Sequence, residues 1–253
     1  MSGCELLDED PELGEHLRPD RWSAAGRACV ARTIELPVGL WEGEFDATTQ
    51  QYGIGLLVLD GLLLRRVSVA GRVGAELLGP GDLLRPWQRE DLGTSLPRAG
   101  GWRALSRSRL AVLDAEFAIR IAPFPEITSA LFARAVRRSR HLAVNMAIVH
   151  HPRVWLRLHM LFWELADRWG RVRADGVHVP LRLTHATLAD LVAVRRPSVT
   201  KALGQLAERN LVHWTGEDWV LVGEPPAELE LATHDALETR EVKQLKTRQP
   251  RGV

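Results

Sequence analysis

The chain has 253 residues, 45% of them hydrophobic and 26% charged, and its formal net charge at pH 7 is +1. This length predicts two domains with cores of their own, and the small net charge means that any affinity for nucleic acid must come from a local basic patch. The two cysteines, Cys4 and Cys29, are too few for an iron–sulfur cluster, no apolar run approaches the roughly 20 residues of a membrane span, and the acidic start is unlike a secretory signal, so we expect a cytoplasmic protein.

Residues 1–33 have the composition of a short helical segment, in which Leu13, Leu17 and Ala24 are expected to line one face. Residues 34–124 change character, because short apolar runs are interrupted there by Gly, Pro and Asp. Strands at this spacing predict a small β-roll, a jelly-roll-like barrel. The whole chain is therefore expected to belong to the α+β class.

Turn residues divide these predicted strands. Asp60–Gly61 and Ala70–Gly71 are both typical of two-residue hairpins, and residues 79–82 (GPGD) predict a tight corner. The last strand is expected to continue to about residue 122, with Asp114 and Glu116 alternating on its solvated face.

The histidines argue against an enzyme. None lies between His16 and His141, so the predicted β-roll offers neither a histidine-rich metal centre nor a base for a Ser or Cys nucleophile. The later histidines lack the i, i+4 spacing of helical zinc ligands and have no cysteine or acidic partner; they are His141, His150, His151 and His159. We therefore expect no catalytic residues, no metal and no cofactor.

Residues 125–150 predict one long helix that serves dimerisation. A seven-residue rhythm of apolar residues favours a coiled-coil seam with a second copy, although Arg138 interrupts it; the seam consists of Leu131, Ala135, Leu142, Met146 and Val149. The same helix carries a basic cluster formed by Arg134, Arg137, Arg138, Arg140 and His141. A solvated face is the favoured interpretation of this cluster, and contact with an anionic effector is the alternative.

Residues 151–224 predict a second domain. Apolar residues from Trp155 to Trp169 step by three and four, as in an amphipathic core helix, and Gly170 follows as a cap. The segment VHVPLRL predicts a strand, and LVHWTGEDWVLV predicts two strands around a turn at residues 215–218. Residues 225–253 are a charged tail that we expect to be partly disordered.

Between these strands, residues 184–211 predict two short helices joined by a tight turn. Thr184 is a candidate N-cap, Ala193-Val194 forms the turn with Val194 filling the gap between the helices, and Pro197 is expected at the first position of the second helix. The second helix has a buried stripe on one face and a basic, hydroxyl-rich face opposite, which suits a major groove.

Two helices followed by a two-stranded hairpin form a winged helix, whose wing usually lies over the phosphate backbone. We expect DNA contacts from Thr184, Thr187, Arg195, Arg196, Ser198, Thr200, Lys201 and His213. An ordinary amphipathic helix pair with a solvated face is the alternative. It explains less well why cations and hydroxyls gather at the start of the second helix while acids do not.

The chain resembles the Crp/Fnr family of bacterial transcription regulators across nearly its whole length. The resemblance rests on three stretches: LVLDGLLLRRV…ELLGPGDLL, VWLRLHMLFWELADRWG and, most diagnostically, PLRLTHATLADLVAVRRPSVTKALGQLAERNLV. It implies a β-roll effector domain, a dimerisation helix and a winged helix. The implied partners are double-stranded DNA at a near-palindromic operator, a second copy of the chain as homodimer, and RNA polymerase as a further candidate.

The chain departs from the family pattern on the recognition helix and in its turn. Family members often carry Arg-Glu-x-x-x-Arg there, whereas this chain has Arg196, then Pro197 in place of the acid and Lys201 in place of the last arginine. Ala193 replaces the turn glycine. Because the acid accepts from cytosine and arginine grips guanine, a different half-site is expected.

The family's cyclic-nucleotide pattern is also altered. The resemblance implies a Gly-Glu pair after the corner, whereas Gly81-Asp82 is followed here by residues 84–87, LRPW. Arg107-Ser108 is only a displaced look-alike of the phosphate cassette, and Leu142 and Ala143 replace the polar pair that meets adenine. We therefore expect no ordinary control by cyclic AMP. The effector-site positions are Gly81, Asp82, Arg85, Trp87, Arg138 and Leu142.

The sequence leaves the effector unidentified. A rival hypothesis treats the β-roll as a small-molecule sensor and the winged helix as a surface for binding another protein.

Overall fold

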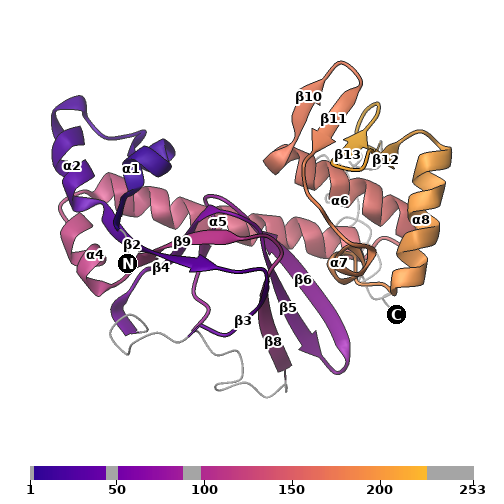
Figure 1. Ribbon diagram of the computed structural model, residues 1–253, viewed down its shortest axis with the longest axis horizontal. Coiled ribbons are helices and arrows are strands. Elements are labelled where there is room, and N and C mark those ends of the chain that lie inside the picture. Colours follow the sequence, from indigo (N-terminus) through magenta and orange to yellow (C-terminus); the bar gives the residue numbers. More distant parts are fainter. Residues whose placement is uncertain (1–2, 44–50, 88–97, 227–253) are drawn as a thin grey trace, which may run out of the picture. The chain divides into compact units, whose positions relative to one another are not determined.

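The computed structural model describes residues 3–43, 51–87 and 98–226 (Figure 1). The chain divides into two compact units, Met1–Met146 and Ala147–Val253, which are described separately. The predicted tail, residues 225–253, lies almost entirely outside the described residues. Among the described helices, none combines the length and apolar character needed to cross a membrane.

The N-terminal segment is mainly helical, as predicted, but it also contributes a strand. Its elements are β1 (Gly3–Glu5), α1 (Leu6–Glu9), η1 (Pro11–Gly14), η2 (Pro19–Arg21) and α2 (Trp22–Ala28). Leu13 and Leu17 are buried as expected, whereas Ala25 is buried in place of the exposed Ala24.

Two antiparallel sheets form the β-roll of the N-terminal unit. The first has the order β1-β2-β9-β4-β7 and the second the order β3-β8-β5-β6. The remaining strands are β2 (Val30–Leu36), β3 (Gly39–Trp41), β4 (Gly55–Asp60), β5 (Leu63–Val69), β6 (Arg72–Leu78), β7 (Leu83–Leu84), β8 (Arg98–Ala104) and β9 (Ser108–Leu113). Within the described residues these strands form two sheets and not one closed barrel.

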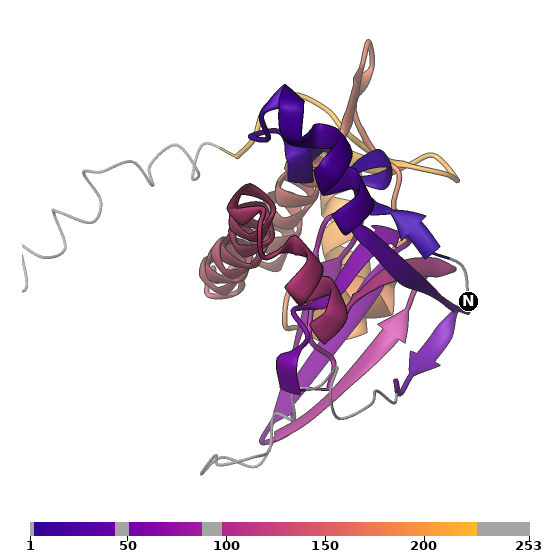
Figure 2. The same ribbon diagram turned by 90° about the vertical axis from the view of Figure 1, so that its left-hand side faces the viewer.

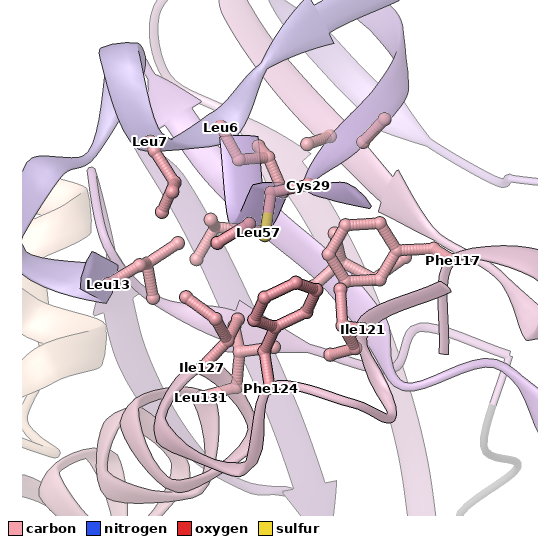
Figure 3. Packing of buried hydrophobic residues seen from close by; sticks show 14 of the residues in the cluster. Leu6, Leu7, Leu13, Cys29, Leu57, Phe117, Ile121, Phe124, Ile127 and Leu131 are labelled. Atoms are coloured by element: carbon pink, nitrogen blue, oxygen red, sulfur yellow. The ribbon is translucent and has the colours of Figure 1, made fainter. Parts of the chain in front are cut away.

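Alternating side chains of the first sheet build two cores, one on each face. Leu56 and Val58 point toward the second sheet, into a cluster that includes Leu63 and Leu78. Leu57, between them, points to the opposite face and packs among the helices (Figure 3). The first sheet is therefore covered by the second sheet on one face and by α1, α2, α4 and α5 on the other (Figures 1 and 2).

Of the two predicted hairpins, one is confirmed and one is wrong. Ala70 and Gly71 have φ of 48° and 73° and join β5 to β6, with Val69 opposite Arg72. Asp60–Gly61 does not form a hairpin, because β4 and β5 belong to different sheets. Gly61 instead takes the chain between the sheets at φ 97°, where a Cβ would lie 2.2 Å from Ser108 Oγ.

The strand expected to reach residue 122 ends earlier. Asp114 accepts a hydrogen bond from the Phe117 amide at 2.9 Å and so caps a helix, α4 (Ala115–Ile121). Phe117 and Ile121 are four residues apart and both are buried. In a helix this spacing places both side chains on one face, and that face packs into the core.

The predicted long helix is confirmed as α5 (Pro125–Val149). The C-terminal unit then contains α6 (Val154–Trp169), β10 (Arg171–Arg173), β11 (Gly176–Val179), α7 (His185–Leu191), α8 (Arg196–Glu208), β12 (Val212–Trp214) and β13 (Trp219–Leu221). Its sheet has the order β10-β11-β13-β12. Strand β10, which the sequence analysis missed, forms a second hairpin with β11.

Candidate nucleic-acid interface

The helix α7 begins at the predicted cap. Thr184 Oγ1 accepts from the Thr187 amide at 3.1 Å, and Leu188 and Leu191 are buried behind it. Thr187 is only 7% exposed, and its hydroxyl lies 3.0 Å from that of Thr184. The expectation that Thr187 contacts DNA is therefore corrected: its side chain is buried and supports the cap.

The turn between α7 and α8 is sharp. Ala193 has φ of 53°, the left-handed conformation that favours glycine, and the Val194 amide donates to Ala189 O at 3.0 Å. Val192 is fully buried, whereas Val194, which was expected to fill the gap between the helices, is only half-buried. Arg157 of α6 donates to Val192 O at 3.2 Å and so holds the end of α7.

Helix α8 begins at Arg196, one residue before the predicted start, with Pro197 in its first turn. It buries Val199, Ala202 and Leu206 and leaves Leu203 half-buried. The opposite face exposes the predicted contact residues Arg195, Arg196, Ser198, Thr200 and Lys201. The first turn of α8 holds no acidic residue, so its exposed charges are all positive.

One contact across the two helices was not predicted. His185 Nδ1 lies 2.9 Å from Thr200 Oγ1, which joins the first residue of α7 to the exposed face of α8. The two residues are 15 positions apart, and apolar periodicity carries no signal for a hydrogen bond between two polar side chains.

The predicted wing is confirmed as β12 and β13, with Trp214 opposite Trp219. Thr215 Oγ1 accepts from the Asp218 amide at 3.1 Å within the turn. Trp219 is buried between Phe162 and Trp214, with ring centroids 4.9 and 5.0 Å away, so it supports the wing from below. His213 is exposed on β12, as a phosphate contact requires.

A buried histidine joins the two hairpins of this unit. His178 on β11 lies 3.0 Å from Asp175 and 3.2 Å from Asp218, a residue of the wing turn. The hydrogen bond from His178 holds the pKa of Asp175 below its ordinary value. The wing turn is thereby fixed to the turn between β10 and β11.

The effector-site positions lie in the N-terminal unit, and two of them shape its corner. Asp82 is buried and accepts from the Gly79 amide at 2.8 Å. Gly81 has φ of 83°, and a Cβ there would lie 2.5 Å from Arg134 Nη1. Arg134 is itself buried and ion-paired with Asp10 at 2.8 Å, so this arginine of the basic cluster is not solvated.

Arg138 and Leu142 lie on the face of α5 that meets β6. Arg138 donates to Glu76 at 3.0 Å and to Leu83 O at 3.2 Å, and Arg65 pairs with the same carboxylate at 2.9 Å. Burial alone would raise the pKa of Glu76, but the two guanidinium groups outweigh it and lower the pKa. Leu142 is half-buried, and three residues on Asn145 donates to Ala75 O at 3.3 Å.

The other two effector-site positions stack on each other beyond the corner. The Arg85 guanidinium carbon lies 5.7 Å from the centroid of the Trp87 ring, with Arg85 exposed and Trp87 half-buried.

Comparison with known proteins identifies the C-terminal unit. Residues 156–227 match the Crp-like helix-turn-helix domain family. A curated relative, the CRP-like cAMP-activated global transcriptional regulator of Mycobacterium tuberculosis, is 29% identical over 143 residues, which cover 56% of this chain and 62% of that protein. The match thus spans less than two thirds of the relative's length.

Solved structures extend the likeness to the fold of most of the chain. A CooA variant from Carboxydothermus hydrogenoformans has a TM-score of 0.63 at 13% identity and covers 90% of this chain and 94% of its own. A cyclic nucleotide-binding domain containing protein from Listeria monocytogenes has a TM-score of 0.62 at 14% identity, covering 86% and 97%.

FixK2 from Bradyrhizobium japonicum has a TM-score of 0.56 at 15% identity and covers 77% of this chain and 93% of its own. The predicted resemblance is therefore confirmed: the chain has the Crp/Fnr fold and carries a Crp-like helix-turn-helix domain.

Proposed function

We propose that this protein is a sequence-specific, DNA-binding transcription regulator that works as a homodimer on a near-palindromic operator. The observation that carries the proposal is the exposed face at the start of α8, where cations and hydroxyls gather without an acid. Arg196 and Lys201 would contact base edges or adjacent phosphates. Arg195, Ser198 and Thr200 would share groove and phosphate contacts, with Thr184 at the start of α7 and His213 on the wing.

The proposal of a homodimer rests on a largely apolar, exposed stripe of α5. Phe132 is 68% and Met146 63% exposed, although both are large hydrophobic residues. With Val136, Ala143 and one polar residue, Ser139, they step by four, three, four and three along the helix, the spacing of a coiled-coil seam. This stripe shares Met146 with the seam expected from the sequence, but its other members each lie one residue further along than the expected positions, because Leu131 is buried in its own unit and Arg138 is held by Glu76.

We further propose that cyclic AMP does not control this protein in the ordinary way. The relative from Mycobacterium tuberculosis is cAMP-activated by name. Here, however, the Glu76 carboxylate already engages Arg138 and Arg65 where α5 meets the β-roll. A nucleotide phosphate would compete with this internal anion for the same guanidinium groups. Titration calorimetry of the full chain with cyclic AMP should give no measurable heat, and micromolar binding would contradict the proposal.

The rival function, a small-molecule sensor whose winged helix binds another protein, predicts a different response to salt. A protein that neutralises phosphates loses affinity for random duplex DNA along a log–log slope of about 0.9 per contact. We expect steep salt dependence for the wild type and a slope smaller by about one per DNA-bound protomer for Lys201→Ala. Arg18→Ala, which removes an exposed cation of the N-terminal unit, is the control.

Absence of binding at low salt would favour the rival.

A second variant tests base reading. Arg196→Ala should reduce the free energy of binding to the operator by about 1–3 kcal/mol and relax the preference at one base pair of each half-site.

A further inference from the structure

The contact between His185 and Thr200 constrains what the recognition helix can read. A threonine hydroxyl has one proton to donate and can accept through its lone pairs. Thr200 Oγ1 has two neighbours inside the protein, His185 Nδ1 at 2.9 Å and Arg196 O at 3.4 Å. Thr200 is exposed, so the rest of its hydroxyl faces outward from α8.

For either form of the histidine, the hydroxyl proton has an acceptor within the protein. If Nδ1 carries no proton, Thr200 donates to it along the shorter contact. If Nδ1 carries a proton, it donates to Oγ1, and the hydroxyl proton then goes to Arg196 O, one helical turn back. In the first arrangement the hydroxyl offers outward only a lone pair, and in the second it does so while its proton stays on Arg196 O; with these hydrogen bonds Thr200 is an acceptor.

An acceptor at this place suits one kind of base edge. In the major groove, the exocyclic amines of adenine and cytosine donate, whereas the corresponding oxygens of guanine and thymine accept. The first turn of α8 has no carboxylate to receive such an amine. The neighbouring Arg196 and Lys201 are donors only and suit the opposite edges.

We propose that His185 is a positioning residue that fixes the Thr200 hydroxyl as an acceptor, and that this hydroxyl reads the exocyclic amine of one adenine or cytosine in each half-site. The inference rests on the proposed DNA-binding function and adds a specificity determinant to it. His185 acts through Thr200 and needs no contact with the base.

The test uses the full chain and a duplex enriched by the wild type from a random pool. Every base pair of both half-sites is replaced by each alternative, and Kd is measured by fluorescence anisotropy. We expect the wild type to lose about tenfold in affinity when one particular A or C is replaced by G or T in both half-sites. Thr200→Val, which keeps the shape but removes the hydroxyl, should reduce this discrimination to about twofold or less, without changing other positions.

Variants of the histidine separate positioning from folding. His185→Ala should lose discrimination at the same position as Thr200→Val, and the double variant should lose no more than either alone. His185→Asn, which keeps a hydrogen-bonding atom near the place of Nδ1, should restore it. Arg196→Ala should alter a different position.

Unchanged preferences in Thr200→Val would overturn the inference while leaving DNA binding intact, as would a uniform loss of affinity in His185→Ala. If the wild type enriches no duplex, the proposed function and this inference fail together.

Discussion

Ala193 shows how a single residue sets the geometry of the site. Its φ of 53° is left-handed, a conformation that costs an L-residue about 1–2 kcal/mol and glycine almost nothing. The amide of Val194 bonds back to Ala189 O, so the turn keeps α7 and α8 at a fixed crossing despite the strain. Glycine would adopt the same conformation at this position at almost no cost.

We predict that Ala193→Gly stabilises the C-terminal unit by about 0.5–1 kcal/mol, because relief of the left-handed strain exceeds the added entropy of the unfolded chain. Urea denaturation followed by circular dichroism measures the change. The control is Ala207→Gly, at an exposed helical position of α8, which should destabilise by up to about 1 kcal/mol. If both variants destabilise equally, the turn is not strained at Ala193.

At this scale the sequence predicts local features well. The Thr184 cap and the turn at Ala193 follow from residue types within a few positions of one another. The burial of Thr187 and the His185–Thr200 contact depend on the tertiary packing around α7, which no local sequence pattern encodes.

Among the elements, α5 shows that periodicity can predict a helix without deciding which of its faces is exposed. The pattern predicts the helix from residue 125, yet two adjacent stripes along it have nearly the same apolar spacing. Only the tertiary structure decides between them: Leu131 fills the core of the N-terminal unit, so the neighbouring stripe that begins at Phe132 faces outward, and Met146, which the predicted seam included, is exposed on it. Arg138 interrupted the predicted seam because it belongs to the inward face.

The prediction of strand pairing from the sequence has the same limit. Asp60–Gly61 has the composition of a hairpin, but its two strands pair with partners far away in the sequence, β4 with β9 and β5 with β8. Ala70–Gly71 was predicted correctly because both strands of that hairpin are local.

The contact between β6 and α5 yields a prediction about pH. The pKa of Glu76 is lowered from 4.5, so its ion pairs stabilise the fold above that pH and the stabilisation is lost as the pH falls through the lower, folded-state value. The difference in free energy of unfolding between the wild type and Glu76→Gln should therefore be largest near neutral pH and shrink below about 4.5. Urea titrations across this range measure it.

Glu116→Gln, which removes an exposed carboxylate from α4, provides the matched control and should leave the pH dependence nearly that of the wild type. A gap between wild type and Glu76→Gln that stays constant with pH would show that the carboxylate is not held by Arg138 and Arg65.

At the scale of the whole molecule, the chain has a β-roll unit and a winged-helix unit, and α5 is the helix through which we propose that two copies associate. The sequence predicts this layout because each unit has its own pattern, period two in the strands and period three to four in the helices. The sequence of one chain predicts assembly least well, because the role proposed for the exposed stripe of α5 requires a second copy of the chain.

We predict that Phe132→Glu together with Met146→Glu converts the dimer to a monomer, because four like charges would face one another across the seam. Sedimentation velocity measures the change, and affinity for the operator should fall with it. Ile119→Glu, at an equally exposed apolar residue on α4, should remain dimeric. A doubly substituted protein that stays dimeric would place the interface elsewhere.

The central claim is that two copies of α8 read two half-sites. Selection of bound duplexes from a random pool by the full chain tests it most directly. We expect enrichment of an inverted repeat whose half-site centres are about 10 base pairs, or one helical turn, apart, and loss of one preferred base in each half when the selection is repeated with Arg196→Ala. Enrichment of a single, unrepeated site, or of no sequence at all at low salt, would contradict the account.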